Sequence, residues 1–188
     1  MPWLDHFDFL APVYDRVITA VQPEQLKKWL HLPTDGYLLD VGGGTGRVAQ
    51  WLTGYVGLVI VLDESPGMVR EAKRKGLAVT LSQAERLPFQ DGAISRILMV
   101  DTFHHLADQA KTAAELLRVL SPEGRLVIKE PDIECGRVKL VALAEKLALM
   151  RSHFYSPSKM KRLFEAAGGR VAISRDDPNF WLAVEKVP

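Results

Sequence analysis

A carboxylate stands directly before a run of glycines in the segment Asp40-Val-Gly42-Gly-Gly44-Thr-Gly46. Glycines at such a turn let the backbone approach a ligand closely, and a helix that begins there presents free N–H groups to an anion. A carboxylate in this place repels a pyrophosphate but attracts a positively charged group. The segment therefore predicts a site for a ligand that has a cationic and an anionic end, unless Asp40 only caps the turn.

Two kinds of nucleotide site compete for this loop. The phosphate-binding pattern that ends in Gly-Lys-Ser/Thr is absent from the sequence, but Gly44-x-Gly46-x-x-Ala49 has the spacing of the dinucleotide fingerprint. Asp63 ends the next strand-like run and suits a ribose under both interpretations. S-adenosylmethionine carries an ammonium, a sulfonium and a carboxylate. Asp40 therefore favours S-adenosylmethionine over NAD(P).

Strand-like and helix-like runs alternate along the chain, which is typical of a parallel α/β sheet. Apolar runs predict strands at 37–41, 56–62, 77–81, 93–100, 125–129, 170–175 and 179–186. The last two strands flank Asp176-Asp177-Pro178, which predicts an antiparallel hairpin, and Pro122-Glu-Gly124 predicts a turn. Periodicity and capping residues predict helices at 24–32, 47–53, 65–75, 108–120, 137–151 and 156–167.

Length and composition limit the class of protein. The 188 residues allow one domain, and 24 Lys plus Arg against 23 Asp plus Glu argue against a dedicated nucleic-acid binder. A single cysteine, Cys135, excludes an intrachain disulfide and a Cys-rich zinc site, and we predict no metal. No apolar run approaches the roughly 18 residues of a membrane span, and the N-terminus lacks the features of a secretory signal. We therefore predict a soluble, cytoplasmic protein.

Segments in fixed order between Leu38 and Glu130 resemble class I S-adenosylmethionine-dependent methyltransferases, of the small-molecule type called methyltransferase type 11. These segments are 40–46, 61–68, 83–89, 100–106 and 115–126. The resemblance implies an α/β, Rossmann-like fold with a mostly parallel seven-stranded sheet, helices on both faces and a C-terminal antiparallel hairpin. It also implies a single methyltransferase domain over 1–188, with an N-terminal helical lid at 1–33 and an acceptor-side helical insertion at 133–156.

The resemblance also assigns a set of residues to the cofactor. Asp40 would neutralise its positive end, Asp63 would accept both ribose hydroxyls, and Ala84 would donate its backbone N–H to the adenine ring. The family has Asp where this chain has Gln83, whose amide also accepts a hydrogen bond but without a charge. Met68 packs either on the adenine or in the helix core. The full set is Tyr14, Asp40, Gly42, Gly44, Gly46, Asp63, Glu64, Met68, Gln83, Ala84, Glu85 and Asp101.

Two adjacent histidines, His104 and His105, follow the predicted strand 93–100 and are the candidate catalytic residues. Methyl transfer from a sulfonium is an in-line displacement, so the protein chiefly aligns the acceptor and excludes water. Imidazole titrates near neutrality and suits the removal of an acceptor proton. His105 matches the family position better, while either histidine alone is as readily a core residue. We expect a small-molecule acceptor, and the N-terminal stretch 7–15, which resembles quinone-biosynthesis C-methyltransferases, favours a quinone-like ring.

The sequence also allows other functions. A non-catalytic S-adenosylmethionine-binding scaffold is favoured by the departure at Gln83 and disfavoured by the intact Asp40 and Asp63. An NAD(P)-dependent oxidoreductase is disfavoured by Asp40. A macromolecular methyltransferase would use the basic groups at 70–75 and 159–162, but no aromatic residues interleave with them to stack bases, so nucleic acid is not expected as a partner. Monomer and homodimer both remain open.

Overall fold

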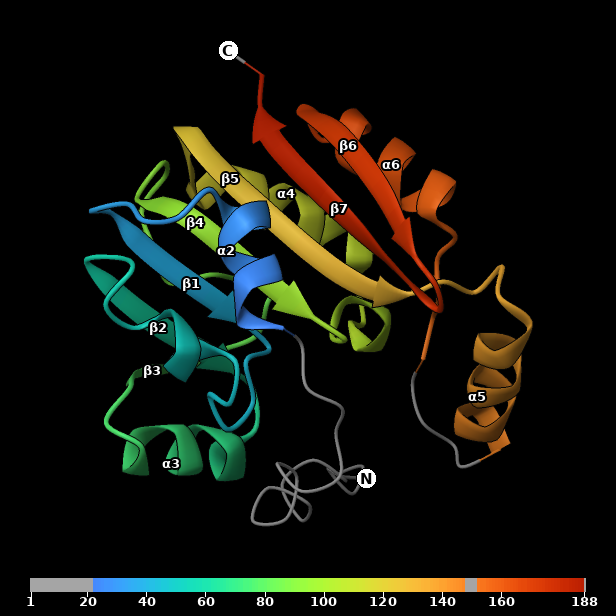
Figure 1. Cartoon of the computed structure of the whole chain (residues 1–188), viewed down its shortest axis with the longest axis horizontal. Helices are drawn as coiled ribbons and strands as arrows, with labels where there is room; N and C mark the ends of the chain where they lie inside the picture. The colour runs from blue at the N-terminus through green and yellow to red at the C-terminus, as the bar shows by residue number, and fades with distance from the viewer. Residues whose placement is uncertain (1–21, 148–151, 188) are drawn as a thin grey trace.

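A seven-stranded sheet runs through the middle of the computed structural model, which describes residues 22–147 and 152–187 (Figure 1). Its strands are β1 (Tyr37–Val41), β2 (Leu58–Asp63), β3 (Ala78–Leu81), β4 (Ile94–Val100), β5 (Leu120–Pro131), β6 (Gly169–Asp176) and β7 (Asn179–Lys186). The strand order is β3-β2-β1-β4-β5-β7-β6, and β7 runs antiparallel to both of its neighbours while the other pairings are parallel. The predicted fold class and the C-terminal hairpin are confirmed.

Helices connect the strands, and three of them begin at a residue whose side chain caps the first turn. They are α2 (Pro23–Leu30), α3 (Pro66–Arg74), α4 (Gln109–Val119), α5 (Gly136–Leu147) and α6 (Pro157–Ala166), with short 3₁₀ turns η2 (Ala49–Leu52) and η3 (Phe103–His105). The side chains of Ser65, Asp108 and Ser156 each accept a hydrogen bond from a backbone N–H three residues later. Such caps satisfy N–H groups that have no partner inside the helix, which fixes where α3, α4 and α6 begin.

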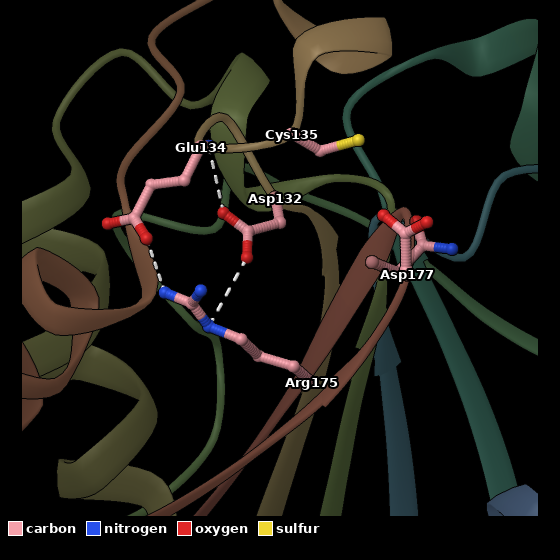
Figure 2. Close-up of a pocket in the computed structure, with 6 residues that line it drawn as sticks. Asp132, Glu134, Cys135, Arg175 and Asp177 are labelled. Atoms are coloured by element: carbon pink, nitrogen blue, oxygen red, sulfur yellow. Dashed lines mark hydrogen bonds and ion pairs between the residues drawn. The ribbon is translucent and has the colours of Figure 1, made fainter.

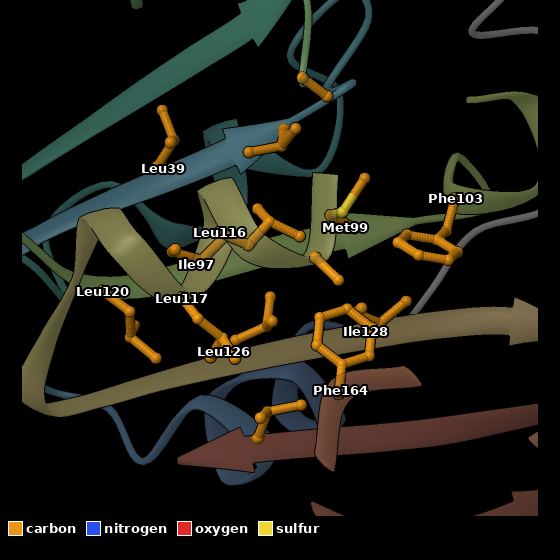
Figure 3. Packing of buried hydrophobic residues seen from close by; sticks show 14 of the residues in the cluster. Leu39, Ile97, Met99, Phe103, Leu116, Leu117, Leu120, Leu126, Ile128 and Phe164 are labelled. Atoms are coloured by element: carbon orange, nitrogen blue, oxygen red, sulfur yellow. The ribbon is translucent and has the colours of Figure 1, made fainter. Parts of the chain in front are cut away.

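The sheet separates two hydrophobic cores. On one face, Leu116 and Leu117 of α4 and Phe164 of α6 pack against Ile97 and Ile128 of the sheet (Figure 3). On the other face, apolar side chains of α2, η2 and α3 cover the strands; they include Leu26, Leu30, Ala49, Leu52 and Ala72. Strands covered on both faces are apolar throughout, which explains why β1 and β2 lack alternation. Both faces therefore carry helices, as predicted.

Two arginines from the sheet hold the end of α2. Arg96 Nε donates to Leu30 O at 2.7 Å, and Arg125 Nε donates to Trp29 O at 2.6 Å. These carbonyls belong to the last helical turn and have no partner within the helix. The Trp29 ring also stacks on the Trp181 ring of β7, with centroids 5.6 Å apart and planes 3° apart. Residues 23–30 of the predicted lid therefore lie along the face of the sheet.

Two local predictions are wrong. Between the positive φ angles of Gly46 and Gly54, the predicted helix 47–53 is only the one-turn η2, because a right-handed helix does not continue through such residues. The helix N-terminus that the sequence predicts as an anion site after the glycine loop is therefore not present as a regular helix. The predicted turn at 122–124 lies inside β5, where a register shift opposite Ile94 and Arg96 absorbs the extra residues. Glu123 therefore avoids the positive φ that a tight turn there would need.

The proposed lid and insertion are described only in part. Residues 1–21, which include Tyr14, and 148–151 lie outside the described residues. Helix α5 occupies 136–147 of the predicted insertion and follows the carboxyl end of β5 (Figure 1). The division into lid, domain and insertion stays a prediction. Among the residues described, none of the helices combines the length and the apolar character that a bilayer crossing requires.

Truncating Phe164 tests the core on the α4–α6 face. The side chain is fully buried and its ring lies 5.6 Å from that of Phe103. We expect Phe164→Ala to lower the free energy of unfolding by about 3–5 kcal/mol, because the cavity it leaves cannot close fully. Leu81→Ala, at a side chain 56% exposed, is the control and should change stability by less than about 1 kcal/mol. Equal losses in urea titrations of both variants would contradict this core.

Candidate active site

The glycine loop lies at the carboxyl end of β1, where ligands bind in open α/β sheets. Gly42 N donates to Leu62 O at 2.7 Å, which ties the loop to β2. Gly42 and Gly46 both have positive φ, and a Cβ would lie 2.1 Å from Thr102 Cγ2 at Gly42 and 2.2 Å from Leu77 Cδ1 at Gly46. These two glycines therefore serve close packing within the protein. At Gly44 a Cβ would meet only Met68 Sδ, at 3.6 Å, so this position is open for a ligand.

Oδ2 of Asp40 is buried and has no hydrogen-bond partner. Within the described part of the chain, no other buried carboxylate oxygen lacks a partner. The side chain is 2% exposed and borders a hollow together with the glycine loop, Arg47 and Asp101. Burial raises the pKa of Asp40 to about 7. The negative charge of Asp63 raises it further by a smaller amount, and the positive charge of Arg47 lowers it. A buried oxygen without a partner is costly. The hollow therefore favours a ligand that brings a cationic donor.

Asp63 is held at the end of β2 by backbone donors. Its Oδ2 accepts from Gly44 N and its Oδ1 accepts from Ser65 N, both at 2.9 Å. Each carboxylate oxygen has a second lone pair for a further hydrogen bond. The backbone thus fixes the orientation of this carboxylate next to the glycine loop.

Asp101 borders the same hollow from the end of β4. Its φ of 52° is in the left-handed region, which costs a non-glycine residue about 1–3 kcal/mol and is found mostly at functional sites. Burial raises the pKa of Asp101, and the charge of Lys129, whose Nζ lies 3.5 Å from Asp101 Oδ1, opposes that shift. Two carboxylates, from β1 and β4, therefore border one hollow.

The structure does not bring every predicted cofactor residue to this hollow. Glu85 Oε1 accepts from the N–H groups of Ala107 and Asp108, so it orders the loop before α4. Gln83 is exposed beside the buried Ala84, at the carboxyl end of β3. The side chain of Met68 is buried beneath Gly44, and Glu64 is exposed.

The two histidines differ in environment. His104 is 4% exposed, and its Nδ1 lies 2.6 Å from Glu130 Oε2. His105 is half-buried, and its Nδ1 lies 3.3 Å from Ser152 Oγ. The two rings contact each other, with centroids 4.0 Å apart. His105 is therefore the more solvent-exposed histidine, while His104 is enclosed in a hydrogen-bonded pair.

Sequence reasoning missed Arg47 and Glu130. Arg47 borders the hollow of Asp40, and its buried Nε has no hydrogen-bond partner among the described residues. Glu130 follows the predicted strand 125–129, and carboxyl ends of neighbouring parallel strands lie at the same edge of a sheet, so its position could have been predicted. Ser152 and Phe154 carry no sequence signal, because only the folded chain brings the segment before α6 onto the histidines.

A larger hollow of about 240 Å³ lies elsewhere, between the loop after β5 and the tip of the β6–β7 hairpin (Figure 2). Its charged groups are paired: Arg175 contacts Asp132 and Glu134, and Asp177 contacts Arg137, which lies outside the lining. None of the residues that line it comes from the glycine loop or the histidine pair. The smaller hollow at Asp40 is therefore the candidate site, since it holds the unpaired polar atoms.

Comparisons with known proteins agree with this geometry. The methyltransferase domain family matches residues 39–128. A demethylmenaquinone methyltransferase of Thermus thermophilus is 34% identical over 139 residues, which cover 66% of this chain and 63% of that protein. The ubiquinone/menaquinone biosynthesis C-methyltransferase UbiE of Acidiphilium cryptum is 30% identical over 148 residues, covering 74% and 54%. The chain thus spans about half to two thirds of these curated relatives.

Solved structures show the same fold. A Thermotoga maritima protein, described as an S-adenosylmethionine-dependent methyltransferase and possible histamine N-methyltransferase, superposes with a TM-score of 0.81 at 20% identity, over 96% of this chain and 98% of that one. A methyltransferase of the same cofactor class from Aquifex aeolicus gives 0.71 at 27% identity, over 87% and 88%. The family and fold imply S-adenosylmethionine as the cofactor. Residues 39–128 thus match a methyltransferase domain, and the chain has the fold of S-adenosylmethionine-dependent methyltransferases.

Proposed function

We propose that this chain transfers the methyl group of S-adenosylmethionine to a small-molecule acceptor. The observation that carries the proposal is the buried, unpaired Oδ2 of Asp40 beside the glycine loop. An ammonium group provides the donor that this oxygen lacks, whereas a pyrophosphate would meet a negative charge there. This favours S-adenosylmethionine over NAD(P) as the ligand of the loop.

Three side chains fit the chemical groups of this cofactor. Asp40 pairs with the ammonium, Arg47 pairs with the carboxylate, and Asp63 accepts from the ribose hydroxyls. Opposite charges at Asp40 and Arg47 border one hollow, and a zwitterionic amino acid complements both of them. When bound, S-adenosylmethionine supplies a methyl group already activated by the sulfonium.

The acceptor side is proposed at the carboxyl ends of β4 and β5. His105, Ser152 and Phe154 meet there, and Leu106 and Tyr155 pack at the border of the adjacent core. Aromatic and apolar surface with a few polar groups suits a small aromatic ring. Curated relatives named for demethylmenaquinone methylation support a quinol-like acceptor for this proposal.

The work of the protein in this reaction is alignment. The glycine loop and the two carboxylates hold the donor, and the segment at 152–155 encloses the acceptor and excludes water. Bound S-adenosylmethionine would supply the methyl group and leave as its neutral thioether. The imidazole of His105 would accept the proton that the acceptor atom releases and pass it to solvent. A cytoplasmic location belongs to the proposal as well.

The affinity for S-adenosylmethionine should rise with pH. Asp40 has a pKa of about 7 in the free protein and must be ionised to pair with an ammonium. Below that pKa, binding has to displace a proton, so the association constant should rise about tenfold per pH unit between pH 5 and 6.5 and level off near pH 7.5. Asp40→Asn should bind more weakly and with little pH dependence. Calorimetric titrations at several pH values measure this, and a flat wild-type profile would refute the pairing.

Arg47 should raise the affinity for ligands that carry a carboxylate and not for those that lack one. We expect Arg47→Met to weaken S-adenosylmethionine binding by about 1–3 kcal/mol, the range for a hydrogen bond to a charged group. Decarboxylated S-adenosylmethionine lacks the proposed partner, so its affinity should be nearly equal in the two proteins. Arg70→Met on α3, which does not line the hollow, is the control. Equal losses for both ligands would show that Arg47 does not contact the carboxylate.

Methyl transfer to a reduced naphthoquinone without its ring methyl group tests the proposed reaction. Radiolabelled methyl should appear in the naphthoquinol, and His105→Ala should lower kcat by about 10²–10⁴-fold with the affinity for S-adenosylmethionine nearly unchanged. His31→Asn, at an exposed histidine that ends α2 and lies outside the 152–155 segment, is the control and should keep its activity. Cofactor binding without transfer to this or other small rings would favour the scaffold function instead.

A further inference from the structure

Glu130 is a buried carboxylate at the carboxyl end of β5, 2% exposed, to which the proposed reaction gives no task. Its Oε1 accepts from Thr102 N and Phe103 N, both at 2.8 Å, and its Oε2 lies 2.6 Å from His104 Nδ1. Burial of a carboxylate is costly unless hydrogen bonds replace water. All three of these contacts go to the loop after β4, so Glu130 fixes that loop against β5.

The same loop abuts the cofactor side of the site. Thr102 Oγ1 donates to Gly42 O at 3.2 Å and lies 3.0 Å from Val100 O. The side chain of Thr102 also fills the space that a Cβ on Gly42 would need. A shift of the loop after β4 would therefore move Thr102 against Gly42 and displace the glycine loop.

Beyond Thr102, the loop holds the segment before α6. The ring of His104 stacks on Phe154, with centroids 4.4 Å and planes 16° apart, and His104 O accepts from His153 N at 2.6 Å. Gln109 Nε2 lies 2.9 Å from both Phe103 O and His153 O, so this residue of α4 links the loop after β4 to the segment before α6. His104 thus holds the segment at 152–154 through its ring and its carbonyl, and Gln109 adds a further contact.

We propose that Glu130 is a positioning residue: through His104 it holds His105 and the 152–155 segment in place against the cofactor loop. That this segment faces the acceptor rests on the proposed function; the positioning itself does not. An ionised carboxylate only accepts hydrogen bonds, so His104 must carry a proton on Nδ1. In Glu130→Gln, the amide oxygen keeps the two backbone donors and the NH₂ group turns toward Nδ1, which must then lose its proton and accept.

Nitrogen-15 histidine NMR and amide exchange of Glu130→Gln test this. In the wild-type protein His104 should be protonated at Nδ1, and in the variant that proton should be absent. Exchange of the His153 amide should accelerate about tenfold relative to the Leu39 amide of β1, as expected for local opening. Glu185→Gln on β7, which contacts Arg125 and Arg170, is the matched control and should leave both signals unchanged. An unchanged His104 proton or an unchanged His153 amide in Glu130→Gln would overturn the proposal.

His104→Asn provides a second variant in case Glu130→Gln does not fold. Asparagine keeps a donor for Glu130 but lacks the ring that stacks on Phe154. The amides of Thr102 and Phe103 should stay protected while that of His153 exchanges about tenfold faster; wild-type exchange at His153 would overturn the proposal. Calorimetry separates the two claims: positioning predicts an affinity for S-adenosylmethionine within about threefold of wild type in both variants. Absence of binding in the wild-type protein would contradict only the proposed function.

Discussion

The buried carboxylate of Asp40 constrains everything at this edge of the sheet. It lies at the end of β1 among apolar strands, and burial raises its pKa to about 7. Its unpaired oxygen is costly in the free protein and is compensated when a cationic group binds. The surrounding residues follow from that need: Gly44 leaves space, Arg47 supplies the opposite charge, and Asp63 is oriented by backbone donors.

The parallel sheet explains why these groups meet. The carboxyl ends of β1, β2, β4 and β5 lie at one edge, so Asp40, Asp63, Asp101 and Glu130 converge although they are far apart in the sequence. Two of these carboxylates border the hollow, while Glu130 is turned to the loop after β4. We propose ligand binding for the two at the hollow and loop positioning for Glu130, because Asp40 Oδ2 has no hydrogen-bond partner among the described residues while Glu130 has three.

The sequence predicts the framework well because its signals are local. Apolar runs for the strands and the caps at Ser65, Asp108 and Ser156 define elements that the structure contains. It predicts the helix at 47–53 and the turn at 122–124 wrongly, because the glycine conformations and the register of β5 depend on neighbouring strands. The family resemblance favours His105 over His104, but the sequence does not show why they differ, since the difference arises from Glu130 and Ser152, contacts between segments distant along the chain. Arg47 was missed because no pattern marks an unpaired buried nitrogen.

Calorimetric titration of the purified protein with S-adenosylmethionine, S-adenosylhomocysteine and NAD tests the assignment of Asp40 to a cationic ligand. We expect micromolar binding of the first two, equivalent to about 8 kcal/mol at 1 μM, and none of NAD, because the carboxylate of Asp40 opposes a pyrophosphate at the loop. Binding of NAD alone would contradict the assignment of Asp40 to a cationic group and the cofactor site with it.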